Sequence, residues 1–516
     1  MPGEEPRLAD LLGALSLATD LAMGQEPEKA VRAAVVAVAL ARRLGFPETE
    51  VADAYWTAVM RHLGCTATPH EERALFGPDD VAMRRVAERT DEAAPRELLG
   101  LLAATGTGAG VRRPAHVVRA LAARRATEDI LRATCEVGAM LAERLGLGEA
   151  VARSLSQILE RWDGKGHPQG LRGEGIAGAA RIVEPATQAV IFHRLGGVEA
   201  ALAMAARRSG GWFDPAVAEA FRDVGPAVLE RLEAEDPWAL FLDAEPEPLR
   251  RIPDHRVDRL AAAFADMADL KSAFTLGHSS GVAELAAAAA RRLKLPDADV
   301  RDLRRAALLH DLGRVGVPIG VWEWPGPLRT ADRERVRLHP YHTERVLARS
   351  EALRPLARVA GMHHERQDGS GYHHGATAAE TPLAARLLGA ADAFHAMTEG
   401  RPHRPARPAE EAAALLGREA AEGRFDPECV RAVLEAAGAR RGRAARAGWP
   451  AGLSDREVEV LRLVATGLSN RQVAARLFIS PRTAEHHVQH IYAKIGTSTR
   501  AAAAMFAMGH GLLRER

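Results

Sequence analysis

Histidine and aspartate residues that could bind metal ions are concentrated between residues 278 and 392 of the 516-residue chain. The set comprises His278, His310, Asp311, His339, His363, His364 and Asp392. Imidazole nitrogens and carboxylate oxygens are ligands typical of Fe, Mn, Ni or Zn rather than of Ca. Because Asp311 directly follows His310, its carboxylate can bridge to a second metal while His310 binds the first. Two metals about 3.5–4 Å apart can stabilise the attacking and leaving oxygens of a phosphodiester, so the set predicts metal-assisted hydrolysis.

Any single histidine pair in this chain is weak evidence for a metal site. The chain has 20 histidines, and adjacent pairs also occur at 373–374 and 486–487. A lone buried histidine is more often a structural residue than a ligand. The sequence that flanks each candidate is therefore what gives the set its weight.

The flanking segments resemble the signatures of one enzyme superfamily. Residues 306–314 (AALLHDLGR) resemble the signature of HD-superfamily metal-dependent phosphohydrolases, and residues 363–372 (HHERQDGSGY) resemble the second signature of the HD-GYP subfamily. Residues 391–394 and 401–404 resemble its closing segment. The resemblance implies a helical bundle with two or three metals, usually iron or manganese, which in many members hydrolyses cyclic di-GMP.

By this resemblance, the candidate ligands divide between two metals. One metal would be bound by His278, His310, Asp311 and Asp392, and the other by Asp311, His339, His363 and His364. Asp311 and Arg314 would be the catalytic residues, and Arg314, Arg366 and Arg404 would contact substrate phosphate.

The sequence also departs from the HD-GYP pattern. Arg314 stands where the family usually has Lys, and His373 replaces the Pro of the Gly-Tyr-Pro triplet. Phe274 replaces a carboxylate that binds a third metal in some members, so we expect two divalent metals, Fe or Mn. Arg314 keeps a positive charge near a phosphate but lacks the compact ammonium geometry of Lys.

The metal-binding segment is the second copy of an internal repeat, and the first copy precedes it in the chain. Residues 41–47 parallel residues 290–296 at an offset of 249, and residues 160–167 parallel residues 365–372 at an offset of 205. The first copy therefore carries about 44 extra residues between the two blocks. Its counterparts of six ligands are Lys29, Arg61, His62, Ile158, Leu159 and Thr187, so it cannot build the same metal site. A structural or dimerising role is favoured for this copy, and ligand sensing is the alternative.

Composition indicates the elements that must position these residues. Aromatic residues make up only 4% of the chain, and Ala, Leu and Arg are abundant, which favours helices over β-sandwiches or barrels. Apolar residues recur at helical spacing, and Gly-Pro or Pro-Asp turns interrupt them. No uninterrupted apolar run approaches the ~20 residues that span a bilayer. We therefore expect an all-α, cytoplasmic protein with two HD-type bundles, the first degenerate, and no membrane contact.

The C-terminal segment is basic and has the helix signals of a DNA-binding module. Residues 440–516 contain 13 Lys/Arg against 5 Asp/Glu, whereas the other 439 residues contain 56 against 63. Capping boxes begin at Ser454 and Ser469, and Ser480 followed by Pro481 predicts the start of a longer third helix. Residues 453–513 strongly resemble the LuxR/FixJ-type helix-turn-helix domain, a four-helix module that typically binds duplex DNA as a dimer.

The resemblance also implies which residues of this module contact DNA. Base edges would be read by Glu485, His486 and Gln489, and phosphates would be contacted by Ser469, Arg471, Arg482, Thr483 and Lys494.

These patterns predict four parts. They are a degenerate HD-like domain over 1–245, an HD-GYP-like phosphohydrolase domain over 246–438, a linker over 439–452 and a LuxR-type DNA-binding domain over 453–516. The combined prediction is a homodimeric transcriptional regulator whose metal centre hydrolyses a cyclic dinucleotide or related phosphodiester. The alternative is a transcription factor that senses a nucleotide or metal without catalysis.

Overall fold

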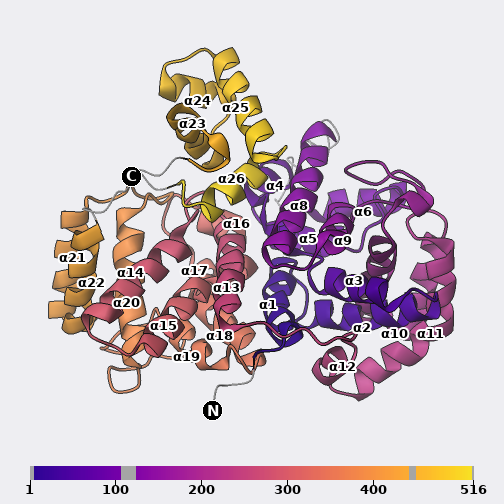
Figure 1. Cartoon of the computed structure of the whole chain (residues 1–516), viewed down its shortest axis with the longest axis horizontal. Helices are drawn as coiled ribbons and strands as arrows, with labels where there is room; N and C mark the ends of the chain where they lie inside the picture. The colour runs from indigo at the N-terminus through magenta and orange to yellow at the C-terminus, as the bar shows by residue number, and fades with distance from the viewer. Residues whose placement is uncertain (1–4, 106–123, 441–448, 514–516) are drawn as a thin grey trace. The chain divides into compact units, whose positions relative to one another are not determined.

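The computed structural model describes residues 5–105, 124–440 and 449–513, and these ranges contain helices and no β-strands beyond isolated bridges. The chain divides into two compact units, Met1–Val257 and Asp258–Arg516 (Figure 1), and each unit is considered by itself. The all-α prediction is confirmed.

The first unit is a helical bundle. Its helices are α1 (Leu8–Ala22), α2 (Lys29–Arg43), α3 (Glu48–Val59), α4 (Pro69–Phe76), α5 (Asp80–Ala87), α6 (Pro95–Thr105), α8 (Arg124–Arg144), α9 (Glu149–Ser156), α10 (Gly178–Arg208), α11 (Pro215–Ala234) and α12 (Pro237–Asp243). α2 lies at its centre and packs against α1, α3, α10, α11 and α12. The following helix, α13 (Asp254–Asp269), contains the boundary between the units.

The second unit contains the predicted metal-binding segment and the C-terminal module. Its helices after α13 are α14 (His278–Arg292), α15 (Asp297–Leu309), α16 (Ile319–Trp322), α17 (Thr330–Arg337), α18 (His339–Arg349), α19 (Arg354–Gly361), α20 (Leu383–Thr398), α21 (Ala409–Ala421), α22 (Pro427–Arg440), α23 (Asp455–Ala465), α24 (Asn470–Leu477), α25 (Pro481–Ile495) and α26 (Arg500–Gly509). α14 packs against α15, α20 and α22.

The internal repeat is visible in matched hydrogen bonds. The Glu160 carboxylate accepts from the backbone N–H groups of Gln169 and Leu171. In the second copy, Glu365 accepts in the same way from the N–H groups 205 residues further on, those of His374 and Ala376. Both copies therefore hold the loop after this glutamate with the same carboxylate cradle.

A close glycine contact locates the extra residues of the first copy. A Cβ at Gly64 would overlap the carbonyl oxygen of Thr134, and a Cβ at Gly313 would overlap that of His339. The glycines are offset by 249 residues and their neighbours by 205, so α8 corresponds to α18 and Thr134 to His339. α4 and α5 correspond to α16 and α17 at the offset of 249, so the extra residues lie between the end of α5 and Thr134 and include α6.

One helix of the described residues, α10, is long and apolar enough to cross a membrane by length and composition, a feature the search for uninterrupted apolar runs did not anticipate. Such a helix is weak evidence, because core helices of globular domains pass the same test. α10 packs against α2, α3 and α11, pairs its buried Glu184 with Arg61, and is interrupted at Gly196 and Gly197.

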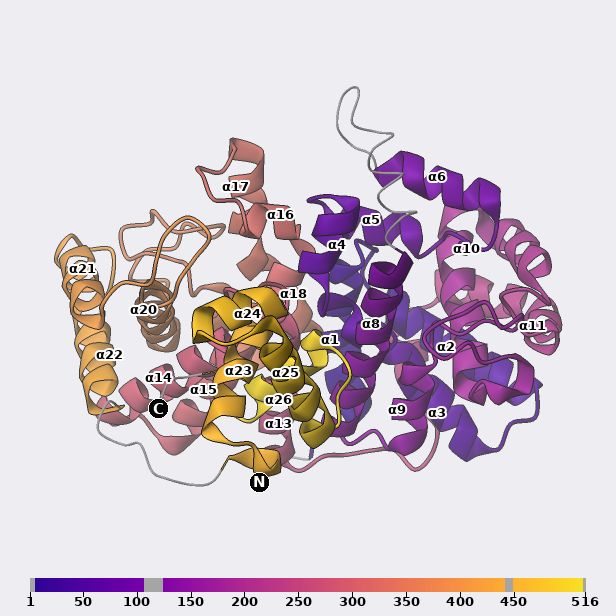
Figure 2. The ribbon, with the colours of Figure 1, turned by 90° about the horizontal axis from the view of Figure 1, so that it is seen from above.

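The C-terminal module is a group of four helices, α23 to α26, drawn in yellow in both views (Figures 1 and 2). Its core is formed by apolar side chains from these helices, including Leu461, Val473, Val488 and Ile491. Both predicted capping boxes are present, and Ser480 caps α25. Phe478, in the turn between α24 and α25, has a positive φ and an almost fully exposed side chain.

Candidate metal centre

The seven predicted metal ligands converge on one site in the second unit. His278 begins α14, His310 and Asp311 follow α15, His339 begins α18, and Asp392 lies in α20. His363 and His364 follow α19. Six of the seven side chains are buried, and His364, 21% exposed, is the one that faces solvent most.

The two aspartates lie between two groups of histidines. Asp311 Oδ1 is 3.2 Å from His339 Nε2 and 3.8 Å from His363 Nε2, whereas its Oδ2 is 3.5 Å from His310 Nε2. Asp392 Oδ1 is 3.1 Å from His278 Nε2. Donor atoms of an ion bound at about 2.1 Å lie roughly 3.0 Å apart in octahedral geometry, so these spacings suit a shared coordination shell.

Hydrogen bonds fix the orientation of three of the histidine rings. The Nδ1–H groups of His310, His339 and His363 each donate to the carbonyl oxygen three residues earlier, at 2.6–2.7 Å. This arrangement leaves the Nε2 lone pair of each ring directed at the aspartates, which is the tautomer that binds a metal.

One buried nitrogen atom without a hydrogen-bond partner indicates that a metal fits this site. His310 Nε2 is buried and has no hydrogen-bond partner. A buried polar atom without a partner costs about 1–3 kcal/mol, and coordination to a metal would remove that cost. The donor set and this atom therefore fit a divalent transition metal.

The charge states of the site also suit metal binding. Burial alone would raise the pKa of Asp311 and Asp392, but neighbouring histidines, together with Arg314 at Asp311, hold both pKa values well below the usual range. Burial, reinforced by the neighbouring His310 and His339, lowers the pKa of His363 to about 3. Carboxylates that stay ionised and an imidazole that stays neutral are the forms that bind metals.

Glu399 is a site residue that the sequence analysis missed. Its carboxylate lies 2.8 Å from His278 Nδ1, so it fixes the ring whose Nε2 faces Asp392. Although burial opposes the shift, Glu399 and Asp392 raise the pKa of His278 to about 10. The available signal was spacing, because Glu399 follows Asp392 by seven residues, or two helical turns.

Two of the predicted phosphate contacts lie beside the centre. Arg314 Nη1 is 3.2 Å from Asp311 Oδ2, and its guanidinium stacks 3.9 Å from the Trp322 ring centre. Arg366 stacks over Phe425 at 4.2 Å and is electrostatically coupled to Asp392. The Tyr372 ring packs against His364, the most exposed ligand, with ring centres 4.4 Å apart and an angle of 37° between the ring planes.

Arg404 is the predicted phosphate contact that the geometry supports least. Its guanidinium donates to backbone carbonyls, including those of Ala396 and Glu399, and so stabilises the end of α20. Arg401 lies nearer the site, where it donates to Glu399 at 2.8 Å.

In the first copy, side-chain cations occupy the corresponding positions. The Lys29 ammonium pairs with the buried carboxylate of Glu88, and His62 Nε2 lies 2.8 Å from the same carboxylate. Arg61 pairs with Glu184. Glu88 directly follows α5, and its counterpart at the offset of 249 is Arg337, so the first copy has a carboxylate that neutralises Lys29 where the second copy has a cation.

The predicted DNA-contacting residues all lie on the C-terminal module, but some side chains are exposed and others already make hydrogen bonds or ion pairs within the module. Exposed side chains on α24 and α25 include Arg471, Arg482, Glu485, His486 and Gln489. Ser469 caps α24, and Thr483 shares a hydrogen bond with Ser480. Lys494 is paired with Glu457 at 2.6 Å, and this contact helps to lower the pKa of Glu457 to about 2.

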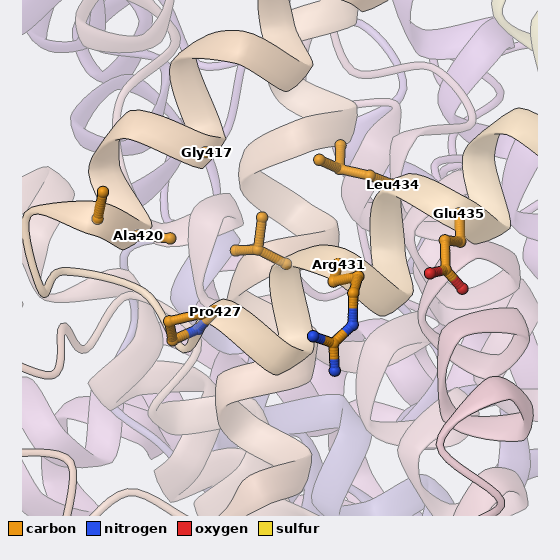
Figure 3. Close-up of a pocket in the computed structure, with 8 residues that line it drawn as sticks. Gly417, Ala420, Pro427, Arg431, Leu434 and Glu435 are labelled. Atoms are coloured by element: carbon orange, nitrogen blue, oxygen red, sulfur yellow. The ribbon is translucent and has the colours of Figure 1, made fainter.

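A groove of about 390 Å³ lies elsewhere in the second unit, between α21 and α22. It is lined mainly by small and aliphatic residues such as Ala420, Val430 and Leu434, with Arg431 and Glu435 at its side (Figure 3). None of the seven predicted ligands lines it.

Comparison with known proteins places this geometry in a family. Residues 262–429 match the family described as HD domain, and residues 451–507 match bacterial regulatory proteins of the luxR family. The chain is 31% identical over 434 residues to a 3'3'-cGAMP-specific phosphodiesterase of Vibrio cholerae, a match that covers 83% of this chain and 94% of that protein.

Two further likenesses agree with that match. A cyclic di-GMP phosphodiesterase of Pseudomonas aeruginosa is 37% identical over 166 residues, which cover 32% of this chain and 40% of that protein. The crystal structure of a cyclic GMP-AMP-specific phosphodiesterase of V. cholerae superposes with a TM-score of 0.59 at 28% identity, covering 84% of this chain and 98% of that one. HD-type phosphohydrolases are metal-dependent. The chain belongs to the HD-GYP phosphodiesterase family and carries a C-terminal domain of the luxR type.

Proposed function

We propose that this chain is a DNA-binding regulator whose second HD copy hydrolyses a cyclic dinucleotide. The observation that carries the proposal is the convergence of five imidazoles and two ionised carboxylates beside Arg314 and Arg366. The whole-length similarity to a 3'3'-cGAMP-specific phosphodiesterase makes 3'3'-cGAMP the first substrate to test, followed by cyclic di-GMP.

The cofactors in this proposal are two divalent metals, Fe or Mn, which when bound would acidify a water molecule and neutralise charge on the phosphate. His278, His310 and Asp392 would hold one ion, and His339, His363 and His364 the other. Asp311 would bridge them, because its two oxygens face different histidine groups.

The chain's other residues would bind and orient the substrate. Arg314, held by Asp311 and Trp322, presents a fixed positive charge to a phosphate at the edge of the centre. Arg366 would contact the same group from the opposite signature segment, and the Tyr372 ring beside His364 would exclude water from that side. Addition of one water across one phosphodiester bond would open the ring and give a linear dinucleotide.

Turnover of purified full-length protein on a panel of cyclic dinucleotides tests this proposal. We expect a linear dinucleotide product from the wild type and loss of at least about 10²-fold in rate for Asp311→Asn. Lys165→Ala removes an exposed charge from the first copy, in the segment that corresponds to the second signature, and is the matched control that keeps activity. A wild type that holds its metals but hydrolyses none of the panel would overturn the enzymatic part.

Two observations favour a second candidate, a sensor that binds a nucleotide without hydrolysing it. The Arg314 guanidinium is held against both Asp311 and Trp322, and His373 replaces the usual Pro in the neighbouring loop. Nucleotide binding measured by calorimetry, without product in the turnover assay, would identify this alternative.

For the C-terminal module we propose binding of duplex DNA by a homodimer in the cytoplasm. The exposed Arg471 and Arg482 would contact phosphates, while Glu485, His486 and Gln489 would read bases. We also propose the domain limits 1–245, 246–438 and 453–516. Of the linker over 439–452, residues 441–448 lie outside the described part of the chain.

A further inference from the structure

A second cluster of possible metal ligands lies outside the catalytic centre. Glu344 projects from α18, and His373 and His374 follow Tyr372 in the loop cradled by Glu365. His374 Nε2 is 2.8 Å from Glu344 Oε2, and His373 Nε2 is 3.6 Å from the same oxygen. None of these three side chains is among the seven ligands of the centre.

The two ring nitrogens of His373 are buried, and Nε2 has only a long contact of 3.6 Å with Glu344. The His373 side chain is 12% exposed, and neither Nδ1 nor Nε2 makes a hydrogen bond. A neutral imidazole has one nitrogen that donates and one that accepts, and neither nitrogen of this ring makes a short hydrogen bond. Leaving buried polar atoms unsatisfied costs about 1–3 kcal/mol each, which a bound cation would partly recover.

The spacing and charge of the cluster suit a small coordination shell. Donor atoms bound to Zn²⁺ at about 2.1 Å lie roughly 3.4 Å apart in a tetrahedron, close to the two distances from Glu344. His373 and His374 lower the pKa of Glu344, so its carboxylate stays ionised. Glu344 is 27% exposed and His374 is 37% exposed, which gives an ion a path from solvent and leaves room for water as the fourth ligand.

We propose that Glu344, His373 and His374 form a separate binding site for one divalent transition metal of the zinc class. Two imidazoles and one carboxylate are the ligand set of open zinc sites, and imidazole also binds Ni²⁺ and Cu²⁺. The site does not depend on hydrolysis at the catalytic centre.

An ion at this site would tie two functional segments together. Glu344 lies on α18, the helix that begins with His339, and His373 directly follows Tyr372. The Tyr372 ring packs against His364, and Arg337 donates to the carbonyl oxygen of Tyr372. A cross-link between α18 and this loop would hold Tyr372 against His364 and restrict the opening of the loop.

Zinc titration of the full chain tests the proposal. Protein purified with its catalytic metals is titrated with Zn²⁺ by calorimetry, and metal content is then measured by mass spectrometry. We expect wild type to bind one more Zn²⁺ than Glu344→Gln or His374→Ala, with the same content of the catalytic metals in all three. Loss of a direct ligand should weaken this site by more than the roughly 10–100-fold that loss of an outer partner costs.

Two further variants control the experiment. His486→Ala with His487→Ala removes the adjacent histidine pair of α25, which should leave the extra Zn²⁺ in place. His373→Pro restores the residue usual in the family and should abolish it, with circular dichroism confirming the fold. If Glu344→Gln and His374→Ala both bind as much Zn²⁺ as wild type, the cluster is only a hydrogen-bonded pair and the proposal is wrong.

Discussion

Removing Lys29 should destabilise the first unit strongly, because its ammonium is paired with Glu88 where both side chains are only 1% exposed. Lys29→Met keeps most of the side-chain volume but leaves a buried carboxylate without its main cation. Breaking a buried ion pair in this way costs about 3–5 kcal/mol. For a unit of this size each kcal/mol lowers Tm by roughly 2–4 °C, so we expect a fall of about 6–20 °C.

A second substitution, Glu88→Gln, removes the carboxylate charge that Lys29→Met leaves unpaired. Burial alone would raise the pKa of Glu88, but Lys29 and His62 hold this pKa below the usual value. The ion pair therefore stabilises the folded state at pH values above the pKa of the carboxyl in the unfolded chain, and this stabilisation is lost as the pH falls through the lowered pKa. Lys29→Met with Glu88→Gln has no uncompensated charge and should recover most of the loss, because replacing both partners is often nearly neutral.

Differential scanning calorimetry of the full chain at neutral pH measures the effect. Arg42→Met is the matched control, because Arg42 lies on the same helix and forms an exposed pair with Glu48 that is worth at most about 1 kcal/mol. A Lys29→Met protein that melts like the control, or a double variant no more stable than the single one, would refute the reasoning.

Three further predictions concern the metal centre and the DNA-binding module. His310→Ala should remove most of the bound transition metal, whereas Lys29→Met should leave it, as elemental analysis of the purified proteins would show. Metal binding by protein depleted of metal should release protons, and the metal affinity should rise with pH, because His278 has a raised pKa and must lose its proton to bind a metal. Glu399→Gln should reduce this pH dependence in calorimetric titrations. The fragment 449–516 should bind duplex DNA with an affinity that falls steeply with salt; Arg482→Ala should weaken all sequences alike, and Gln489→Ala should mainly reduce discrimination in a competition assay.

Local helix signals made the C-terminal module predictable in detail. Ser454, Ser469 and Ser480 were predicted to begin helices, and each caps one in the structure. The fourth helix of the module, α26, is likewise capped by a hydroxyl side chain, that of Thr499. These signals act within three or four residues, so the sequence contains all the information that they require.

Contacts that depend on tertiary structure were not predictable in the same way. The convergence of the seven ligands could be expected because two signature segments flank them, but the role of Glu399 depends on how the end of α20 meets α14. Glu88 lies 59 residues after Lys29, and its counterpart in the second copy is Arg337 rather than a carboxylate, so no alignment within the chain could pair it with Lys29. Arg404 was assigned from its neighbourhood in sequence, whereas its donors point back to the backbone of its own segment.

If the second copy binds metals as proposed, the pairing of Lys29 with Glu88 would make the two HD copies respond differently to the supply of metal in the cell. The inward nitrogens of the histidines in the second copy would coordinate ions, so its rigidity would rise and fall with metal availability. In the first copy, the positive charge at the equivalent position is covalently part of the chain and cannot be lost by dilution or chelation. During metal starvation, one half of the protein would therefore keep its shape while the other half loosened, and the intact half would remain ready to support recovery when metal returned.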